Sequence, residues 1–285
     1  MCASYNRGIM SNTEWRSLVG RLIGLFYLVV LLSVSVLVFF PFIFSFTAGL
    51  KTSSEIFKSG IHLFPEKWDW GNYVETWRRL KMIKMFSNSI FAAGGGVLGQ
   101  IVVSTTAAYS LSRLKPIGGK IITAMVLITL GIPVMAYIVP RYVFMVVDLG
   151  LINSFWGLWL VYAVSPFMIL ILTNSFKAIP KEIFEAAQLD GASEVRMFFK
   201  IALPLSSSII FILGLLGFVT LWGDFLWPYL IMMGAPELQP VSVRLVTLTR
   251  YLPLNLFLAG SFIAMIPTTI AAIFLVRKIK GGLTL

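Results

Sequence analysis

Residues 179–204 read IPKEIFEAAQLDGASEVRMFFKIALP and form the longest hydrophilic segment in the C-terminal two-thirds of a very apolar chain. Pro180 suits the first turn of a helix, where its missing N–H would be unpaired anyway. Only good or neutral helix formers separate it from Gly191, which can take the left-handed conformation that ends a helix. Ser193 can cap a second helix, and Pro204 can stop it. The segment is therefore predicted to fold as a helix, a glycine turn and a second helix.

This segment also offers groups that another protein could bind. Ala186 and Ala187 leave one helix face nearly bare, so that a second surface can approach it closely. Glu182, Glu185 and Asp190 provide carboxylates for a basic partner. These residues alone leave two interpretations open, a solvated connector between membrane spans and a docking site.

The composition is that of a polytopic membrane protein. Of 285 residues, 58% are hydrophobic and 12% charged, and the mean hydropathy is +0.89, whereas a soluble domain carries about 25% charged residues. The net charge of +11 does not indicate a nucleic-acid partner here, because most cations adjoin apolar segments. Cys2 is the only cysteine, which excludes an intrachain disulfide or a cysteine-based metal site. His62, the only histidine, lies in a polar loop, and no catalytic residue is predicted.

Six apolar segments are predicted to cross the membrane, since about 20 apolar residues span the hydrocarbon layer as a helix. They are residues 22–46, 88–112, 121–140, 151–173, 205–225 and 258–276. The first is too long for the core of a signal peptide and is expected to be a retained anchor, although Ala48-Gly49 faintly resembles a cleavage site. Gly95 and Gly99 form a strip where another helix can pack closely, and Pro133 predicts a kink.

The cations predict the orientation of these spans. Loops on the side of the two termini hold 13 Lys and Arg residues, and loops on the other side hold 10, of which 7 lie in residues 49–87. Short loops orient a membrane protein most strongly. Residues 1–21 and the hydrophilic segment are therefore expected in the cytoplasm, with residues 22–285 forming one transmembrane domain. Within the long loop, residues 73–85 are predicted to be an amphipathic helix, either at the membrane interface or on the protein surface.

The chain lacks a phosphate-binding loop of its own. Its nearest match, Gly118-Gly119-Lys120, is followed by Ile121, which has no hydroxyl for magnesium. Uphill transport would therefore need energy from another subunit or from an ion gradient. Ion coupling usually requires charges within the spans, and the one candidate is Asp224 at the edge of the fifth span. It is interpreted as an interfacial carboxylate that caps a helix end, with a proton relay as the alternative.

An aromatic cluster follows the fifth span. Its members are Trp222, Phe225, Trp227 and Tyr229. Such rings can stack on a sugar face, or they can form the aromatic belt found at membrane interfaces. The belt is the favoured interpretation.

The hydrophilic segment resembles the EAA coupling loop of ABC importer permeases. The residues that carry this resemblance are Glu185, Ala186, Ala187, Asp190, Gly191, Ile201, Leu203 and Pro204. The similarity covers about residues 70–284 and is greatest to the MalG-like branch of carbohydrate importer permeases. The further matches, in their family order, are Asn72-Tyr73, Asn88-Ser89, residues 107–113 (AAYSLSR), Ile132-Pro133, Pro140, residues 149–153 (LGLIN), Ser165-Pro166-Phe167, residues 224–228 (DFLWP), Ile266-Pro267 and Gly282-Leu283-Thr284.

The resemblance implies an all-α inner-membrane permease with six transmembrane helices and a cytoplasmic coupling helix pair between helices 4 and 5. In that family the loop seats in a cleft of the ATPase subunit. The implied partners are a second related permease, two ATPase subunits that bind ATP and magnesium, an extracytoplasmic solute-binding protein and the lipid bilayer, with no cofactor in this chain. The rival interpretations are an ion-coupled secondary carrier and a membrane scaffold without transport activity.

Two departures from the family pattern bear on function. The family often has Trp-Asn-Asp near the fifth span, where this chain has Trp222-Gly223-Asp224. The usual tail continues past Gly-Leu-Thr, whereas this sequence stops at Leu285, which leaves a tail contact with the ATPase open. In the maltose system the partner permease holds most of the sugar, so the resemblance places no substrate site here.

Overall fold

The computed structural model describes residues 12–58 and 62–282, and the side chains of residues 20–58 and 62–278. Cys2, Arg7 and the tail matches Leu283 and Thr284 lie outside the described residues. Every regular element in the described part is helical, which confirms the predicted all-α class.

Three helices are each long and apolar enough to cross a membrane by themselves. They are α1 (Asn12–Gly49), α4 (Met82–Tyr109, continued by a π-helical turn to Leu114) and α15 (Leu254–Gly282). Among the described residues, three bent helix pairs bring the number of spans to six if each pair counts as one. Each of the six predicted apolar segments overlaps one of these spans.

The bent pairs differ in the sharpness of their breaks. α5 (Gly119–Gly131) meets α6 (Val134–Val143, continued to Asp148) at 106°. α7 (Phe155–Tyr162) meets α8 (Pro166–Ala178) at 44°. The helix Glu194–Leu205 meets α12 (Ser207–Gly223) at 75°. The chain then forms the short helices α13 (Leu226–Ile231) and α14 (Val241–Leu248).

Two prolines shape the third span. The kink expected at Pro133 is confirmed but is a complete break, because Ile132 before it is extended, with φ −88° and ψ 116°. The expectation that the helix ends at Pro140 is wrong. Pro140 lies inside α6, and helical structure continues through Arg141 to Asp148, so most of the stretch between the predicted spans 121–140 and 151–173 is helix and not loop. Residues Phe144–Asp148 form a π-helical turn, which is the kind of local adjustment by which membrane helices accommodate proline.

α4 is the centre of the packing and contacts α7, α8, α12, α14 and α3. The predicted small-residue strip lies against α7. A Cβ atom on Gly95 would lie 2.3 Å from the Trp159 indole, and one on Gly99 would lie 3.0 Å from the Cβ of Ala163. These two glycines therefore allow an approach that larger residues would block.

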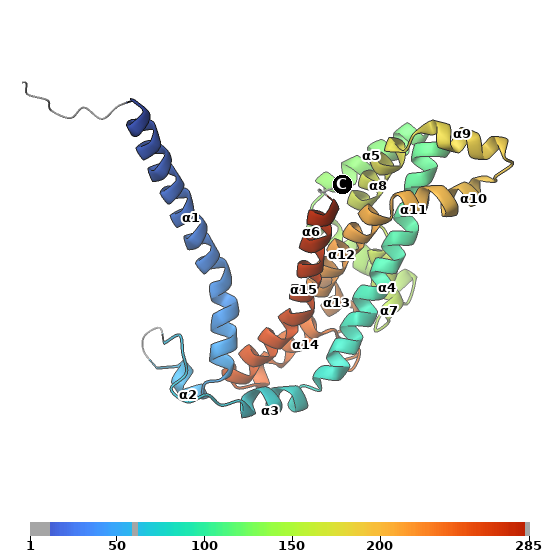
Figure 1. Ribbon diagram of the computed structural model, residues 1–285. Coiled ribbons are helices and arrows are strands. Elements are labelled where there is room, and N and C mark those ends of the chain that lie inside the picture. The colour runs from blue at the N-terminus through green and yellow to red at the C-terminus, as the bar shows by residue number, and fades with distance from the viewer. Residues whose placement is uncertain (1–11, 59–61, 283–285) are drawn as a thin grey trace, which may run out of the picture.

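Of the side chains described in α1, those near its C-terminal end attach the helix to the rest of the protein. The side chains of residues 20–43 are all exposed. Burial begins near the end of the helix, and Ala48 and Leu50 are fully buried. The Ser45 hydroxyl donates to the carbonyl of Leu258 at 3.0 Å, and the Tyr73 hydroxyl to that of Phe46 at 2.9 Å. Figure 1 shows α1 leaning away from the other helices, with its start and the end of α15 toward the same end of the molecule as α9 and α10.

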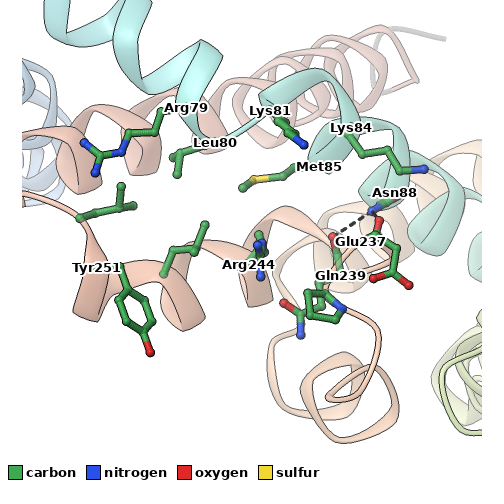
Figure 2. Close-up of a pocket in the computed structure, with 13 residues that line it drawn as sticks. Arg79, Leu80, Lys81, Lys84, Met85, Asn88, Glu237, Gln239, Arg244 and Tyr251 are labelled. Atoms are coloured by element: carbon green, nitrogen blue, oxygen red, sulfur yellow. Dashed lines mark hydrogen bonds between the residues drawn. The ribbon is translucent and has the colours of Figure 1, made fainter.

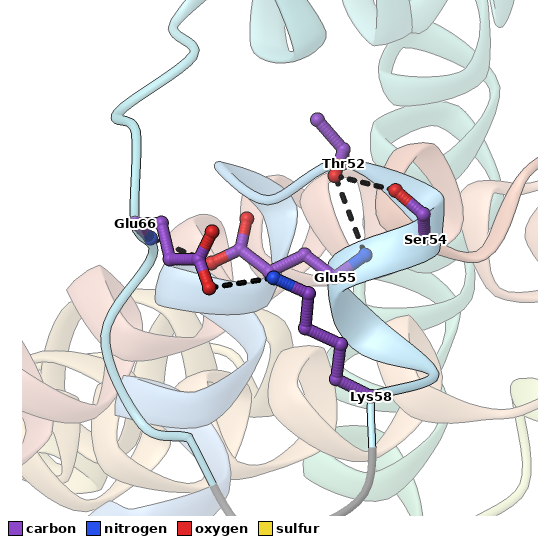
Figure 3. A network of polar contacts seen from close by, with 5 residues as sticks. All are labelled: Thr52, Ser54, Glu55, Lys58 and Glu66. Atoms are coloured by element: carbon purple, nitrogen blue, oxygen red, sulfur yellow. Dashed lines mark hydrogen bonds and ion pairs between the residues drawn. The ribbon is translucent and has the colours of Figure 1, made fainter.

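The loop after α1 closes on itself through polar contacts. Thr52 caps the short helix α2 (Ser53–Ile56) by accepting from the backbone N–H of Glu55. The Glu55 carboxylate accepts from the backbone N–H of Glu66 at 2.6 Å, and the Glu66 carboxylate pairs with the Lys58 ammonium at 2.6 Å, as Figure 3 shows. The ion pair raises the pKa of Lys58 and lowers that of Glu66.

The single amphipathic helix predicted over residues 73–85 is wrong in its extent. α3 spans Gly71–Arg79, and the left-handed backbone of Lys81 (φ 50°) separates it from α4. Buried Asn72 donates to the carbonyl of Lys51, and buried Thr76 to that of Leu256 at the start of α15. The inner face of α3 therefore packs on protein.

Candidate functional site

The helix–turn–helix predicted for residues 179–204 is present. α9 (Lys181–Leu189) begins directly after Pro180, and Gly191 has a φ of 78°, as the turn requires. The Ser193 hydroxyl caps the second helix by accepting from the backbone N–H of Arg196 at 3.3 Å. That helix comprises α10 (Glu194–Met197), a π-helical turn and α11 (Leu203–Leu205), so it ends one residue beyond Pro204. We call α9 and the helix Glu194–Leu205 the coupling pair.

An aromatic cluster anchors the coupling pair to the spans. Phe184 of α9 is 6% exposed and packs with Tyr109 of α4, Phe176 of α8 and Phe198 of the second helix. The guanidinium of Arg113, at the end of α4, lies 4.2 Å from the centre of the Phe184 ring. Because the rings come from four helices, the coupling pair is held by α4 and α8 together.

Polar contacts reinforce this anchor. Arg113 donates to the carbonyls of Phe176 and Ile179, which lie at the end of α8, where carbonyls lack helical partners. The Tyr109 hydroxyl donates to the Glu194 carboxylate at 2.9 Å, and the side-chain amide of Gln188 donates to the other oxygen at 3.3 Å. The contact of Glu194 with Tyr109 therefore ties the second helix directly to α4.

The eight predicted docking residues divide between two faces. Ala187, Ile201 and Leu203 are half-buried and pack against the aromatic cluster. The residues that face outward are Glu185, Ala186, Asp190, Gly191 and Pro204. Leu189, at 90% exposed, and Val195, at 67%, lie on either side of the turn. The outward face thus joins carboxylates to exposed apolar side chains.

Sequence reasoning assigned no role to Arg113, Tyr109, Phe184 or Glu194. The family match at residues 107–113 includes Tyr109 and Arg113, and this match was the available sequence signal for them. Glu185, singled out as a docking group, forms an exposed ion pair with Lys181 at 3.6 Å. Such a pair is worth little, so the carboxylate remains available to a partner.

The aromatic interface belt expected after the fifth span is wrong for two of its members. Trp222 is 4% exposed and donates its indole N–H to the carbonyl of Ala264 at 3.1 Å. Trp227 is 2% exposed and donates to that of Gly157 at 3.1 Å. Neither indole faces lipid, because helices enclose both rings. Trp222 is closed off from solute as well, whereas Trp227 borders a small cavity.

Asp224 follows the C-terminal end of α12, as predicted, but its carboxylate bonds to another helix and does not cap α12. Its carboxylate accepts from the Tyr162 hydroxyl at 2.7 Å, and its backbone carbonyl accepts from the Ser242 hydroxyl at 2.8 Å. The guanidinium of Arg141 lies on the face of the Trp227 ring, 4.1 Å from its centre. An acid and a base from separate spans therefore lie in one region of the fold.

A cationic pocket of about 560 Å³ lies between the start of α4 and α14. Arg79, Lys81, Lys84 and Arg244 line it together with Glu237, as Figure 2 shows. Asn88 donates to the carbonyls of Glu237 at 2.7 Å and Gln239 at 3.1 Å, which fixes one wall. The pocket is at the opposite end of α4 from the coupling pair.

Comparison with known proteins identifies the family. Residues 100–280 match the family described as "Binding-protein-dependent transport system inner membrane component". The diacetylchitobiose uptake system permease protein NgcG of Streptomyces coelicolor is 31% identical over 196 residues, covering 68% of this chain and 64% of that protein. The osmoprotective compounds uptake permease protein GgtD of Synechocystis is 32% identical over 200 residues, covering 69% and 67%.

Other relatives match over more of the chain. The sn-glycerol-3-phosphate transport system permease protein UgpE of Pectobacterium atrosepticum is 28% identical over 264 residues, covering 89% of this chain and 94% of that protein. A chain in the crystal structure of a bacterial ABC transporter involved in the import of the acidic polysaccharide alginate has a TM-score of 0.80 at 21% identity, covering 95% of this chain and 99% of that chain. That likeness concerns the fold. With its match over residues 100–280, this chain belongs to the family of binding-protein-dependent transport system inner membrane components.

Proposed function

We propose that this chain is the permease subunit of an ATP-driven ABC importer for a carbohydrate or a related hydroxyl-rich solute. The family supports a multi-pass protein of the inner membrane. The names of the relatives support the solute class, since they include the uptake of diacetylchitobiose, sulfoquinovosyl glycerol and sn-glycerol 3-phosphate. An ion-coupled carrier and a scaffold without transport activity are not favoured.

The observation that carries the proposal is the construction of the coupling pair. Its inner side is held by Phe184, Arg113 and Glu194, while Glu185, Ala186 and Leu189 project outward. A pair bound in this way to α4 and α8 moves with them. We infer that its outward face docks on an ATPase subunit and carries the motion of that subunit to the spans.

In the proposed cycle, ATP and magnesium bind to two partner ATPase subunits, and this chain holds no nucleotide. Closure of the ATPase dimer displaces the coupling pair, and the spans rotate as a body. The pathway then changes between inward- and outward-facing states. Nucleotide and solute drive this change only to the extent that they bind the two states differently.

The remaining proposed partners lie in and outside the membrane. A second, related permease or lipid would cover the exposed apolar side of α1. An extracytoplasmic solute-binding protein would dock at the end that carries the cationic pocket, opposite the coupling pair. Both termini would lie in the cytoplasm on this assignment. We propose no nucleic-acid partner.

Co-purification of the ATPase subunit, with an ATPase assay in reconstituted membranes, tests the docking proposal. Glu185→Lys reverses a charge on the outward face, and Ala186→Trp adds bulk to it. Both should detach the ATPase and abolish solute-stimulated ATP hydrolysis. Ala187 is a poorer test site, because it also packs inward. Lys181→Gln removes only an exposed ion pair and should change little.

Full ATPase association and full coupled hydrolysis in both Glu185→Lys and Ala186→Trp would show that the coupling pair is a solvated connector. The proposed role of this segment would then be rejected.

A further inference from the structure

A cavity of about 320 Å³ lies among α4, α6, α7 and the end of α12. Four polar side chains from four different helical segments line it, namely Gln100, Arg141, Tyr162 and Asp224. The rest of the lining is mostly apolar. Its volume lies within the range of small-molecule sites, about 300–1,000 Å³.

Two of these polar groups are short of partners. Gln100 is 9% exposed, and its amide forms no hydrogen bond with any described residue. The Nε of Arg141 is buried without a hydrogen bond, and its guanidinium contacts ring faces of Trp227 and Tyr137. Asp224 accepts one bond, from Tyr162, which leaves acceptor capacity on its carboxylate. Unpaired buried polar groups are costly, which favours a polar occupant of the cavity.

The depth of the cavity determines what that occupant can be. Gln100 lies 18 residues from Met82 and 14 residues from Leu114 along one helix, which is about 27 Å and 21 Å at the rise of an α-helix. The hydrocarbon layer is about 30 Å thick, so the cavity lies at membrane depth. A charge facing lipid there costs about 2.5–3.5 kcal/mol on insertion scales. Arg141 and Asp224 are therefore expected to face water or solute.

We propose that this cavity is a solute-contact site on the translocation pathway and that it takes a neutral, hydroxyl-rich solute. A guanidinium donates hydrogen bonds, a carboxylate accepts them and an amide does both, so neighbouring hydroxyls can bridge the three groups. Arg141 alone would suit an anion, but the Asp224 carboxylate lines the same cavity and opposes a second negative charge. This inference rests on the proposed permease function and adds a site and a solute class to it.

Thiol labelling tests whether the cavity is aqueous, without knowledge of the solute. Gln100→Cys and Leu98→Cys are made in a Cys2→Ser background, and the assembled transporter is treated with a membrane-impermeant methanethiosulfonate, with and without ATP. Leu98 is the matched control, since it lies on the same helix but is 65% exposed and apolar. Gln100→Cys should react at least tenfold faster than Leu98→Cys in one of the two states, with or without ATP. A rate no higher than that of Leu98→Cys in both states overturns the proposal.

Uptake into vesicles tests solute contact, with radiolabelled sucrose, maltose, sorbitol and glycerol 3-phosphate as probes and rates normalised to assembled complex. Asp224→Asn and Arg141→Met should each lower ATP-driven uptake of a neutral probe at least tenfold, and Arg141→Lys should retain more. Asp148→Asn, an exposed acid at the end of α6, is the control. Unchanged uptake in Asp224→Asn and Arg141→Met, or uptake of glycerol 3-phosphate alone, overturns the assignment. Uptake of none of the probes by the unmodified transporter counts instead against the proposed function.

Discussion

At the scale of single residues, the turn between the coupling helices depends on the backbone of Gly191. Its φ of 78° lies in the left-handed region, and a Cβ atom there would meet nothing within 4 Å. A substitution at this position therefore tests backbone strain without a steric clash. Left-handed backbone costs an L-residue about 1–2 kcal/mol, and Asn tolerates it better than a β-branched residue.

We expect Gly191→Val to distort the turn and to abolish solute-stimulated ATP hydrolysis while the permease stays in the membrane. Gly191→Asn should keep most of the coupled activity. ATPase assays on reconstituted complexes, with immunoblots for the membrane-bound permease, compare the two. Equal activity in both variants would show that the geometry of the turn does not matter for coupling.

At the scale of elements, the packing of α4 on α7 depends on which glycine faces the neighbour. A Cβ atom on Gly95 would lie 2.3 Å from the Trp159 indole, whereas one on Gly94 would meet nothing within 4 Å. The two residues are adjacent in one helix, so their helix propensities and membrane depths are matched.

Gly95→Ala should therefore displace Trp159 and destabilise the protein by about 1–3 kcal/mol, the usual cost of overpacking. Gly94→Ala should be neutral or slightly stabilising, because Ala is the better helix former. Thermal denaturation of the detergent-solubilised complex measures the difference. A melting temperature for Gly95→Ala as high as that for Gly94→Ala would contradict the close contact between α4 and α7.

At the scale of the whole molecule, the orientation of the spans is the prediction that matters most for function. The coupling pair and the cationic pocket lie at opposite ends of α4, so one membrane orientation assigns a side to each. Lys120 and Glu237 are exposed positions near these two ends.

In a Cys2→Ser background, we expect Lys120→Cys to be labelled by an impermeant maleimide only in inverted vesicles. Glu237→Cys should be labelled only in intact cells. This result would place both termini and the coupling pair in the cytoplasm. The reverse labelling pattern would rule out ATPase docking at the coupling pair.

The sequence by itself determined the features that local chemistry controls. Apolar runs long enough for a bilayer determined the spans, and Gly191 and Ser193 determined the turn and cap of the coupling pair, because these depend on neighbours in the chain. The kink at Pro133 was also predictable, since proline disfavours helical backbone at the preceding residue, but its extent was not, because Pro140 lies within a continuous helix. Its angle was not predictable either, because it depends on what α5 and α6 pack against.

Only the tertiary structure decided which distant residues meet. Arg113 and Phe184 are 71 positions apart, yet the guanidinium of one lies over the ring of the other. Trp227 was predicted to be an interfacial residue, because the sequence does not distinguish an indole that faces lipid from one that a neighbouring helix covers. Gln100, Arg141 and Asp224 line one cavity because α4, α6 and the end of α12 converge there. Convergence of this kind is a property of helix packing, which no local pattern in the chain encodes.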